Sequence, residues 1–160
     1  MPQRQIDATD VRILNALQTQ GRLTNVDLAA HVGLSPSPCL ARVKALEKAG
    51  IIDRYVALVK PESVGLGVSV FIQVTLERQV EQALERFEAR MLAFDEVMEC
   101  YLMTGDSDYL VRLVLPDMES LQRFIVKELT TIPGVSNIRS SFALKQVKYK
   151  TALPLQGRSA

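Results

Sequence analysis

Apolar residues recur at helical spacing in three successive stretches of residues 7–50. Each stretch follows a residue type that caps the amino terminus of a helix, namely Asp7, Thr24 and Ser35. Gly33 and Gly50 come after the second and third stretches, at positions where glycine commonly ends a helix. The pattern therefore predicts three short helices in this part of the chain.

The third stretch, SPSPCLARVKALEKAG at 35–50, carries two prolines close to its start. Pro36 falls at the first helical residue and Pro38 within the first turn, where the backbone N–H groups have no intrahelical acceptor. The prolines are therefore expected to begin this helix rather than break it. Its predicted buried stripe is Leu40, Val43 and Leu46, which leaves the opposite face to solvent or to a partner.

The second and third predicted helices are joined by a short connection at 32–35, which is the spacing of a helix-turn-helix. Residues 51–59 alternate and could form a small hairpin or wing. Residues 1–60 hold eight of the 19 Lys and Arg residues but only five of the 18 acidic ones, and a basic surface suits DNA. The alternative is a plain three-helix bundle with a solvated basic face. The expected DNA contacts are Ser35, Pro36, Ser37, Pro38, Arg42, Lys44 and Lys48. Arginine suits guanine or phosphate and lysine suits phosphate.

From Val68 onward the apolar period changes from helical to alternating, which predicts a strand. A helical stretch follows, then two strands around a turn at Gly105, a helix capped by Asp117, and a long last strand over 135–149. The order β-α-β-β-α-β is the ferredoxin-like arrangement, with both helices on one face of an antiparallel sheet. The predicted fold class is α+β, a winged helix-turn-helix domain followed by a ferredoxin-like domain. The expected bounds are 1–60 for the first domain, 61–67 for a linker, 68–150 for the second domain and 151–160 for a tail.

The face of the sheet that the two helices leave open is expected to carry the apolar residues Phe71, Leu102 and Phe142. An open apolar face must be buried by something else, most simply by a second copy of the chain. The sequence thus predicts a homo-oligomer of at least two chains.

Composition excludes several other classes of protein. No apolar run approaches the ~20 residues that span a bilayer, and the amino terminus lacks the apolar stretch of a signal peptide. Cys39 and Cys100 lie far apart, with no CxxC pair or histidine nearby, so neither a disulfide nor a metal site nor a cofactor is expected. A cytoplasmic protein without membrane contact fits these features.

Three stretches resemble the Lrp/AsnC, or leucine-responsive/asparagine-responsive, family of transcription regulators. They are IDATDVRILNALQTQGRLTNVDLAAHVGLSPSPCLARVKALEKAGII, then GDSDYLV, then the PGV turn at 133–135. The resemblance implies double-stranded DNA as a partner, a recognition helix beginning at Ser35, and a second domain that binds a small effector, usually an amino acid. It also implies dimers that assemble further, often as a ring of four dimers. The family's effector site matches the turn from Thr104 to Tyr109 and lies between C-terminal domains.

The chemistry of that turn suits an amino acid. Asp106 and Asp108 can accept from an ammonium group, and a turn with Gly105 can offer backbone N–H groups to a carboxylate. Neighbouring apolar side chains could line a slot, which makes leucine or methionine the most plausible effector. The expected effector contacts are Leu102, Met103, Thr104, Gly105, Asp106, Asp108 and Tyr109. The alternative is that the two carboxylates are solvated turn residues and that the glycine only provides a positive φ.

Two other functions remain open from the residues alone. One is a metabolic enzyme of ferredoxin-like fold with an accessory helical domain, although the sequence shows no nucleophile–base set, P-loop or G-x-G-x-x-G. The other is an oligomeric effector-binding module whose helical domain binds protein. The leading interpretation is a transcription regulator that binds DNA and responds to a small metabolite.

Overall fold

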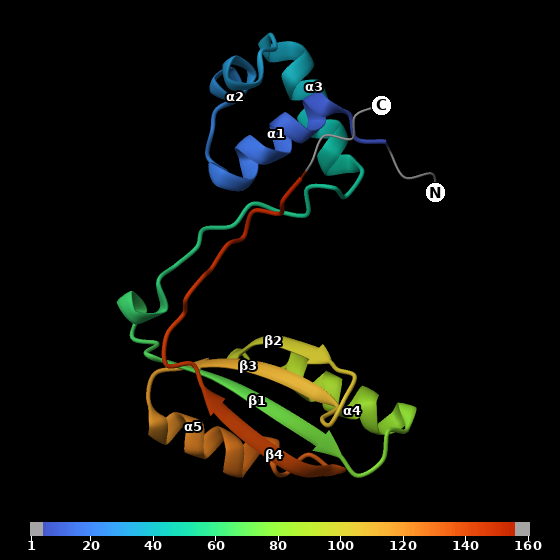
Figure 1. The fold of residues 1–160 in the computed structure, drawn as a ribbon, viewed down its shortest axis with the longest axis vertical. Helices are drawn as coiled ribbons and strands as arrows, with labels where there is room; N and C mark the ends of the chain where they lie inside the picture. Colours follow the sequence, from blue (N-terminus) through green and yellow to red (C-terminus); the bar gives the residue numbers. More distant parts are fainter. Residues whose placement is uncertain (1–4, 156–160) are drawn as a thin grey trace. The chain divides into compact units, whose positions relative to one another are not determined.

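Three helices build the first part of the protein, as predicted, although Ser35 stands at the start of the third without a capping hydrogen bond from its side chain. The structure is a computed structural model that describes residues 5–155. The helices are α1 (Ala8–Thr19), α2 (Asn25–Val32) and α3 (Pro36–Lys48) (Figure 1). Asp7 and Thr24 accept hydrogen bonds from backbone N–H groups in the first turns of α1 and α2. Pro36 is the first residue of α3, directly after Ser35, so the prolines begin this helix as expected.

The core of this unit takes one face from each helix. Ile13, Leu28, Cys39 and Leu46 are between 0% and 2% exposed and pack together. Cys39 occupies the place predicted for Leu40, which is 41% exposed. The reason is the helical period, because residues 39, 43 and 46 share one face of α3 whereas residue 40 lies beside it.

A segment near the carboxyl end of the chain completes the first unit, which takes in residues 147–155. The side chain of Gln18 and the backbone of Leu153 exchange two hydrogen bonds. Gln18 Nε2 donates to the Leu153 carbonyl at 3.3 Å, and Leu153 N–H donates to Gln18 Oε1 at 2.6 Å. Leu155 packs against the same apolar core. The second unit comprises Val59–Gln146.

The segment after α3 differs from the expected wing. Residues 51–60, all of them described, contain no strand and follow an irregular path. Val56, Leu58 and Val59 are each more than 60% exposed. An isolated hairpin has little stability without a surface to pack on, and the stretch after Asp53 has no glycine or asparagine for a tight turn.

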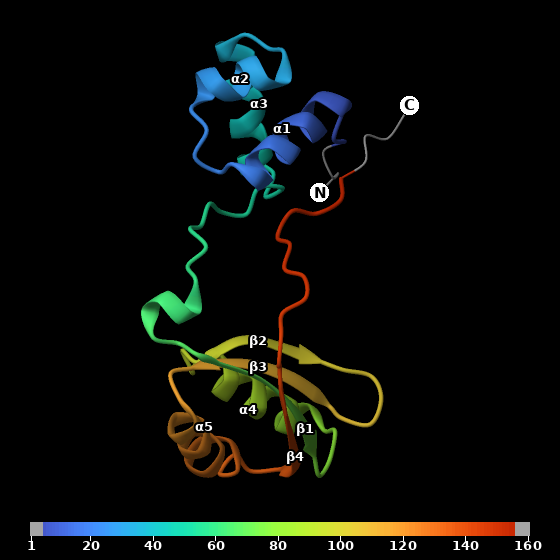
Figure 2. The same cartoon turned by 60° about the vertical axis from the view of Figure 1, so that its left-hand side comes forward.

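The second unit confirms the predicted β-α-β-β-α-β order. Its elements are β1 (Val68–Leu76), α4 (Glu81–Leu92), β2 (Val97–Leu102), β3 (Tyr109–Leu115), α5 (Met118–Phe124) with a following π-helical turn (Ile125–Leu129), and β4 (Val135–Phe142). A short 3₁₀ helix at Pro61–Val64 precedes them. The strands form one antiparallel sheet in the order β2-β3-β1-β4, and α4 and α5 cover the same face of it (Figures 1 and 2). Within the described residues no helix is long and apolar enough to cross a membrane.

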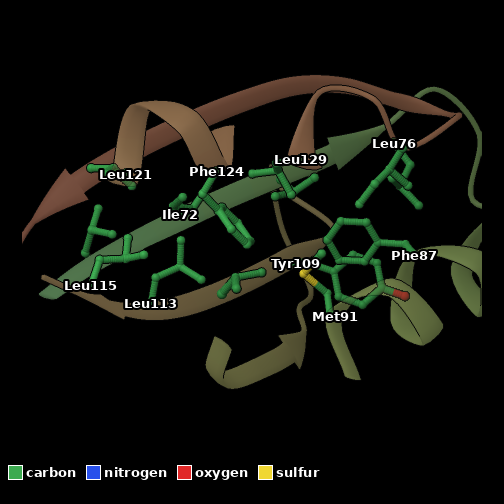
Figure 3. Packing of buried hydrophobic residues seen from close by; sticks show 14 residues of the cluster. Ile72, Leu76, Phe87, Met91, Tyr109, Leu113, Leu115, Leu121, Phe124 and Leu129 are labelled. Carbon is green, nitrogen blue, oxygen red and sulfur yellow. The ribbon is translucent and has the colours of Figure 1, made fainter. Parts of the chain in front are cut away.

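The core of the second unit lies between the sheet and these two helices (Figure 3). Ile72 and Leu113 point from the central strands β1 and β3 toward Phe87 and Met91 of α4 and Phe124 of α5. All five are between 0% and 5% exposed. Burial on one face only explains the alternating pattern that revealed the strands.

The last strand is shorter than the sequence suggests. It was expected to run to Tyr149, but β4 ends at Phe142. Its one partner in the sheet is β1, and their pairing ends with Phe142 opposite Val70. Only Val68 and Ser69 of β1 extend beyond this pair, so most of the alternating stretch 143–149 has no strand beside it to form a ladder.

The pairing register corrects the residues expected on the open face of the sheet. Leu102 pairs with Tyr109 and Phe142 with Val70, and both partners are buried on the helix side. Paired residues point to the same face of a sheet, so Leu102 and Phe142 lie on the helix side and their prediction was wrong. Phe71 alternates with Val70 and does lie on the open face.

The apolar residues of the open face therefore differ from two of the three predicted. Beside Phe71 it carries Tyr101 and Leu110, which pair with each other across β2 and β3. It also carries Arg112, whose guanidinium donates to Glu99 at 2.9 Å. A partner on this face would therefore meet a mixed surface with an ion pair.

Candidate DNA-binding helix and effector site

One face of α3 presents two lysines to solvent. Ser37, Lys44 and Lys48 are exposed, and their spacing of seven and eleven residues puts them in a row along the helix. Cys39 and Leu46 occupy the opposite, buried face. The predicted contacts Ser37, Lys44 and Lys48 thus share one exposed surface.

The amino terminus of α3 is also exposed and is held by the preceding helix. Ser35, Pro36 and Pro38 are exposed, and the carbonyl of Pro36 accepts a hydrogen bond from Asn25 Nδ2 at 2.8 Å. Asn25 is the first residue of α2. Sequence reasoning missed this residue, because a polar side chain at a helix start is ordinarily explained by capping.

Arg42 does not share the exposed face of α3. It lies five residues after Ser37, which is about 140° around the helix, so its assignment to the outward face was a geometric error. Its Nη1 lies 2.7 Å from Asp7 Oδ2 and 2.8 Å from Asp10 Oδ1. The hydrogen bond from the backbone N–H of Asp10, followed by that from Arg42, lowers the pKa of Asp7, while the two carboxylates raise the pKa of Arg42. Arg42 therefore joins α3 to the start of α1.

The turn between β2 and β3 is an exposed hairpin loop. The N–H of Met103 donates to the carbonyl of Asp108 at 2.7 Å and closes it. Gly105 has a φ of 123°, which a residue with a Cβ rarely adopts, so the predicted conformational role of this glycine is confirmed. Thr104 and Asp106 are exposed at its tip.

Asp108 is not a solvated turn residue. It is 4% exposed, and its Oδ2 accepts a hydrogen bond from the backbone N–H of Leu76 at 2.6 Å. Its Oδ1 accepts from the side chain of Gln79, and its own N–H donates to the carbonyl of Val74. The carboxylate thus faces the end of β1 and ties the turn to it, which differs from the expectation that it faces an effector.

Tyr109 is likewise buried, at 1% exposed. Its ring lies against Phe87 with the centroids 4.5 Å apart, and its hydroxyl donates to Glu88 Oε1 at 2.7 Å. Burial and then this hydrogen bond raise the pKa of Tyr109. Burial and then the nearby charge of Glu88 raise the pKa of Cys100 to about 11. Glu88 therefore affects both Tyr109 and Cys100, although nothing in the sequence pointed to a role for it.

A cavity of about 380 Å³ opens beside these residues, between α4 and the edge strand β2. Such a volume lies within the range of small-molecule sites. Its walls are mainly apolar, with two carboxylates, and include Glu88, Met91, Phe94, Cys100, Leu102 and Tyr109. Leu102 and Tyr109 are the predicted effector residues that line it. Met103, Thr104, Gly105 and Asp106 belong instead to the adjoining turn.

Residues 5–155 contain no group of three or more His, Cys, Asp or Glu side chains that could hold a metal ion. Cys39 and Cys100 are both free thiols.

Models of known protein families match both units of the chain. Residues 6–53 match a winged helix-turn-helix DNA-binding family. Residues 69–153 match the Lrp/AsnC ligand binding domain. The two matches agree with the fold class expected from the sequence.

Known proteins match over almost the whole length. The chain is 45% identical to the Bkd operon transcriptional regulator of Pseudomonas aeruginosa, over 94% of this chain and 99% of that protein. It is 38% identical to the leucine-responsive regulatory protein of Salmonella typhimurium, over 98% of this chain and 96% of that protein. A transcriptional regulator of Neisseria meningitidis, solved as a complex with L-Met, superposes with a TM-score of 0.90 at 46% identity, covering 94% of this chain and 97% of that one.

Proposed function

Because this chain belongs to the Lrp/AsnC family of DNA-binding transcription regulators, which are not enzymes, we propose that it binds operator DNA through α3 and senses an apolar amino acid next to the 103–108 turn. It would act in the cytoplasm, where the DNA lies. The observation that carries the effector half of this proposal is the 380 Å³ cavity beside the glycine-bearing turn.

The proposed DNA contacts are the exposed lysines and the amino terminus of α3. Lys44 and Lys48 would neutralise phosphates, and Ser37 lies on the same exposed face. Within the first turn of α3 the N–H of Ser37 is the donor available to a phosphate oxygen, because Pro36 and Pro38 have no N–H and the N–H of Cys39 donates to the carbonyl of Ser35. The two prolines fix the shape of the tip that would enter the major groove.

In the proposed effector site, polar and apolar parts of one ligand meet different residues. Asp106 is exposed in the turn and would accept from the ammonium group, while backbone N–H groups near Gly105 would bind the carboxylate. The ligand's side chain would enter the cavity lined by Leu102 and Tyr109. The names of the relatives, one leucine-responsive and one solved with L-Met, favour leucine or methionine.

We further propose that the chain forms dimers and a ring of four dimers. The open sheet face with Phe71, Tyr101 and Leu110 gives a partner both apolar and polar groups to contact. An effector held between chains would favour one assembly over another and so change the spacing of the DNA-binding units.

Calorimetry with each of the twenty amino acids tests the effector proposal. Leucine or methionine should bind the wild-type protein, and the Asp106→Ala variant should bind it at least tenfold more weakly, since the ammonium group loses its acceptor. Glu62→Ala is the matched control, because Glu62 is an exposed carboxylate of the same unit outside the turn. Equal affinity in the Asp106 and Glu62 variants would remove Asp106 from the site, and no heat with any amino acid would refute the effector function.

A further inference from the structure

Three charged side chains join the recognition helix α3 to the start of α1. Arg42 Nη1 donates to Asp7 Oδ2 at 2.7 Å and to Asp10 Oδ1 at 2.8 Å. Asp10 is 1% exposed, whereas the side chains of Arg42 and Asp7 are 33% and 53% exposed. The contact is therefore buried at its Asp10 end and partly exposed at its Arg42 end, so breaking it costs more than breaking a fully exposed ion pair.

The same two carboxylates also shape the first turn of α1. Asp7 Oδ1 accepts from the N–H of Asp10 at 2.8 Å, and Asp10 Oδ2 accepts from the N–H of Asp7 at 3.5 Å, which is a capping box. Arg42 thus binds the two side chains whose positions α1 itself fixes. The bond reaches across 32 and 35 residues of sequence, so it sets the position of one helix against another.

This contact acts on the side of α3 that faces away from DNA in the proposed function. Arg42 is about 140° around the helix from Ser37 and the lysine row. A rotation or shift of α3 would break the bonds to Asp7 and Asp10, and it would move Lys44 and Lys48 by the same rotation. Rigid support of this kind is what keeps a binding constellation in its productive geometry.

We infer that Arg42 is a positioning residue, which with Asp7 and Asp10 fixes the orientation of the recognition helix and does not itself contact DNA. This inference rests on the proposed use of α3 for DNA binding. It replaces the expectation from the sequence that Arg42 reads a base or grips a phosphate.

The two roles predict opposite effects of an acidic substitution. If Arg42 contacted DNA, Asp10→Asn would remove one of the two carboxylates that hold its guanidinium and a negative charge that repels phosphates, so affinity for DNA would rise or stay the same. If Arg42 positions the helix, the same substitution weakens the support and affinity falls, although the protein has become more positive. A loss of affinity on removing a negative charge is a result that simple electrostatics does not produce.

The experiment uses the full chain and a duplex that the wild-type protein selects from a random-sequence pool, with a scrambled duplex of equal length for comparison. Affinities are measured by fluorescence anisotropy over a range of salt concentrations, well below the melting temperature of each variant. Arg42→Met and Asp10→Asn should each weaken binding to the selected duplex at least tenfold and reduce its preference over the scrambled one. The slope of log affinity against log salt should stay at its wild-type value, because no phosphate contact is lost.

Two comparison variants calibrate these results. Lys44→Met removes a proposed phosphate contact and should make the salt slope shallower by about 0.9. Asp53→Asn removes one negative charge at a position where the side chain is 85% exposed and forms an ion pair with the exposed Arg54. This variant should leave the affinity unchanged or slightly higher. Asp7→Asn keeps a good helix cap, since asparagine caps as well as aspartate, but loses one charge that faces Arg42. Asp7→Asn should bind DNA several-fold more weakly than wild type. If Arg42→Met or Asp10→Asn fails to fold, the direction of this change in affinity decides between the two roles of Arg42.

Asp10→Asn or Asp7→Asn binding as tightly as wild type, together with a shallower salt slope for Arg42→Met, would overturn the inference and restore Arg42 as a DNA contact. Failure of the wild-type protein to select any duplex would refute the proposed DNA function itself, and the inference with it. If Lys44→Met leaves the slope of log affinity against log salt unchanged, only the proposed phosphate contact of Lys44 is refuted. The change in DNA affinity caused by Asp10→Asn is measured independently of that result.

Discussion

Replacing Asp108 with alanine is expected to destabilise the second unit by about 2–3 kcal/mol. The carboxylate of Asp108 accepts a hydrogen bond from the backbone N–H of Leu76 at 2.6 Å. Both residues are buried, with Asp108 4% and Leu76 5% exposed. Without the carboxylate this N–H has no acceptor in a region that water reaches poorly. An unsatisfied buried donor costs about 1–3 kcal/mol, and bonds to a charged acceptor lie at the upper end. The lost bond to Gln79 adds to this.

For a domain of this size, 1 kcal/mol changes the melting temperature by about 4–8 °C. Asp108→Ala should therefore melt about 10–20 °C below wild type, measured by circular dichroism at one fixed protein concentration because oligomers melt in a concentration-dependent way. Amide hydrogen exchange supplies a local measurement, since the N–H of Leu76 should lose its protection. Asp108→Asn should fall between, because asparagine can still accept from Leu76 but presents an NH₂ group to the side chain of Gln79 or to that backbone N–H.

Asp106→Ala is the matched control for Asp108→Ala. Both residues belong to the same turn and both lose a carboxylate, but Asp106 is exposed, so its replacement should change stability by no more than about 0.5 kcal/mol. A surface substitution that costs about 0.5 kcal/mol lowers the melting temperature by about 2–4 °C. If Asp108→Ala melts within about 4 °C of Asp106→Ala, the role assigned to Asp108 in holding the turn is wrong.

Two further predictions concern ionisable groups. The pKa of Cys100 is raised from 9.0 to about 11, so this thiol should react with iodoacetamide at pH 8 about 100-fold more slowly than an unperturbed thiol, because only the thiolate reacts. Leucine or methionine bound in the adjoining cavity should slow the reaction further. A reaction rate equal to that of the urea-unfolded chain would contradict the buried placement of Cys100. The pKa of Asp7 is lowered in the folded protein, so its carboxylate adds stability that is fully present above the ordinary pKa of 3.8 and is lost as the pH falls through the folded pKa. Acid unfolding monitored by circular dichroism should therefore be less steep in this pH range for Asp7→Asn. Identical unfolding curves would show that protonation of Asp7 does not affect stability.

Local signals in the sequence were sufficient to predict the helices of the first unit. Asp7, Thr24 and Gly33 act within one turn of their own positions, as caps or in the left-handed conformation. The effect of Pro36 is equally local, since its lack of an N–H matters only for an acceptor within the same helix. Features of this kind do not depend on the rest of the fold, and for this reason they could be recognised from the residues alone.

Non-local partners limited the prediction of the sites. The side of the sheet on which Leu102 and Phe142 lie depends on the strands that pair with them, and these are known only once the register is known. Arg42 donates a hydrogen bond to Asp10, and Asp108 accepts one from Leu76; in each pair the two residues are 32 positions apart in the sequence. The sequence identifies Arg42 and Asp108 as charged, but it does not say whether the group that each one binds belongs to a ligand or to the chain itself.

In the 103–108 turn, the exposure of each carboxylate indicates whether it can bind a ligand or is already bound by the chain. A carboxylate that binds an exchangeable amino acid must be reachable from solvent, which favours Asp106, whereas the 4% exposed Asp108 is already bound by the chain. The turn can present Asp106 in one place only if its base is fixed, and Asp108 fixes it to the end of β1. Substitutions should therefore separate the two roles: Asp106→Ala weakens effector binding at constant stability, whereas Asp108→Ala lowers stability and effector affinity together, because a loosened turn must be ordered again each time the ligand binds.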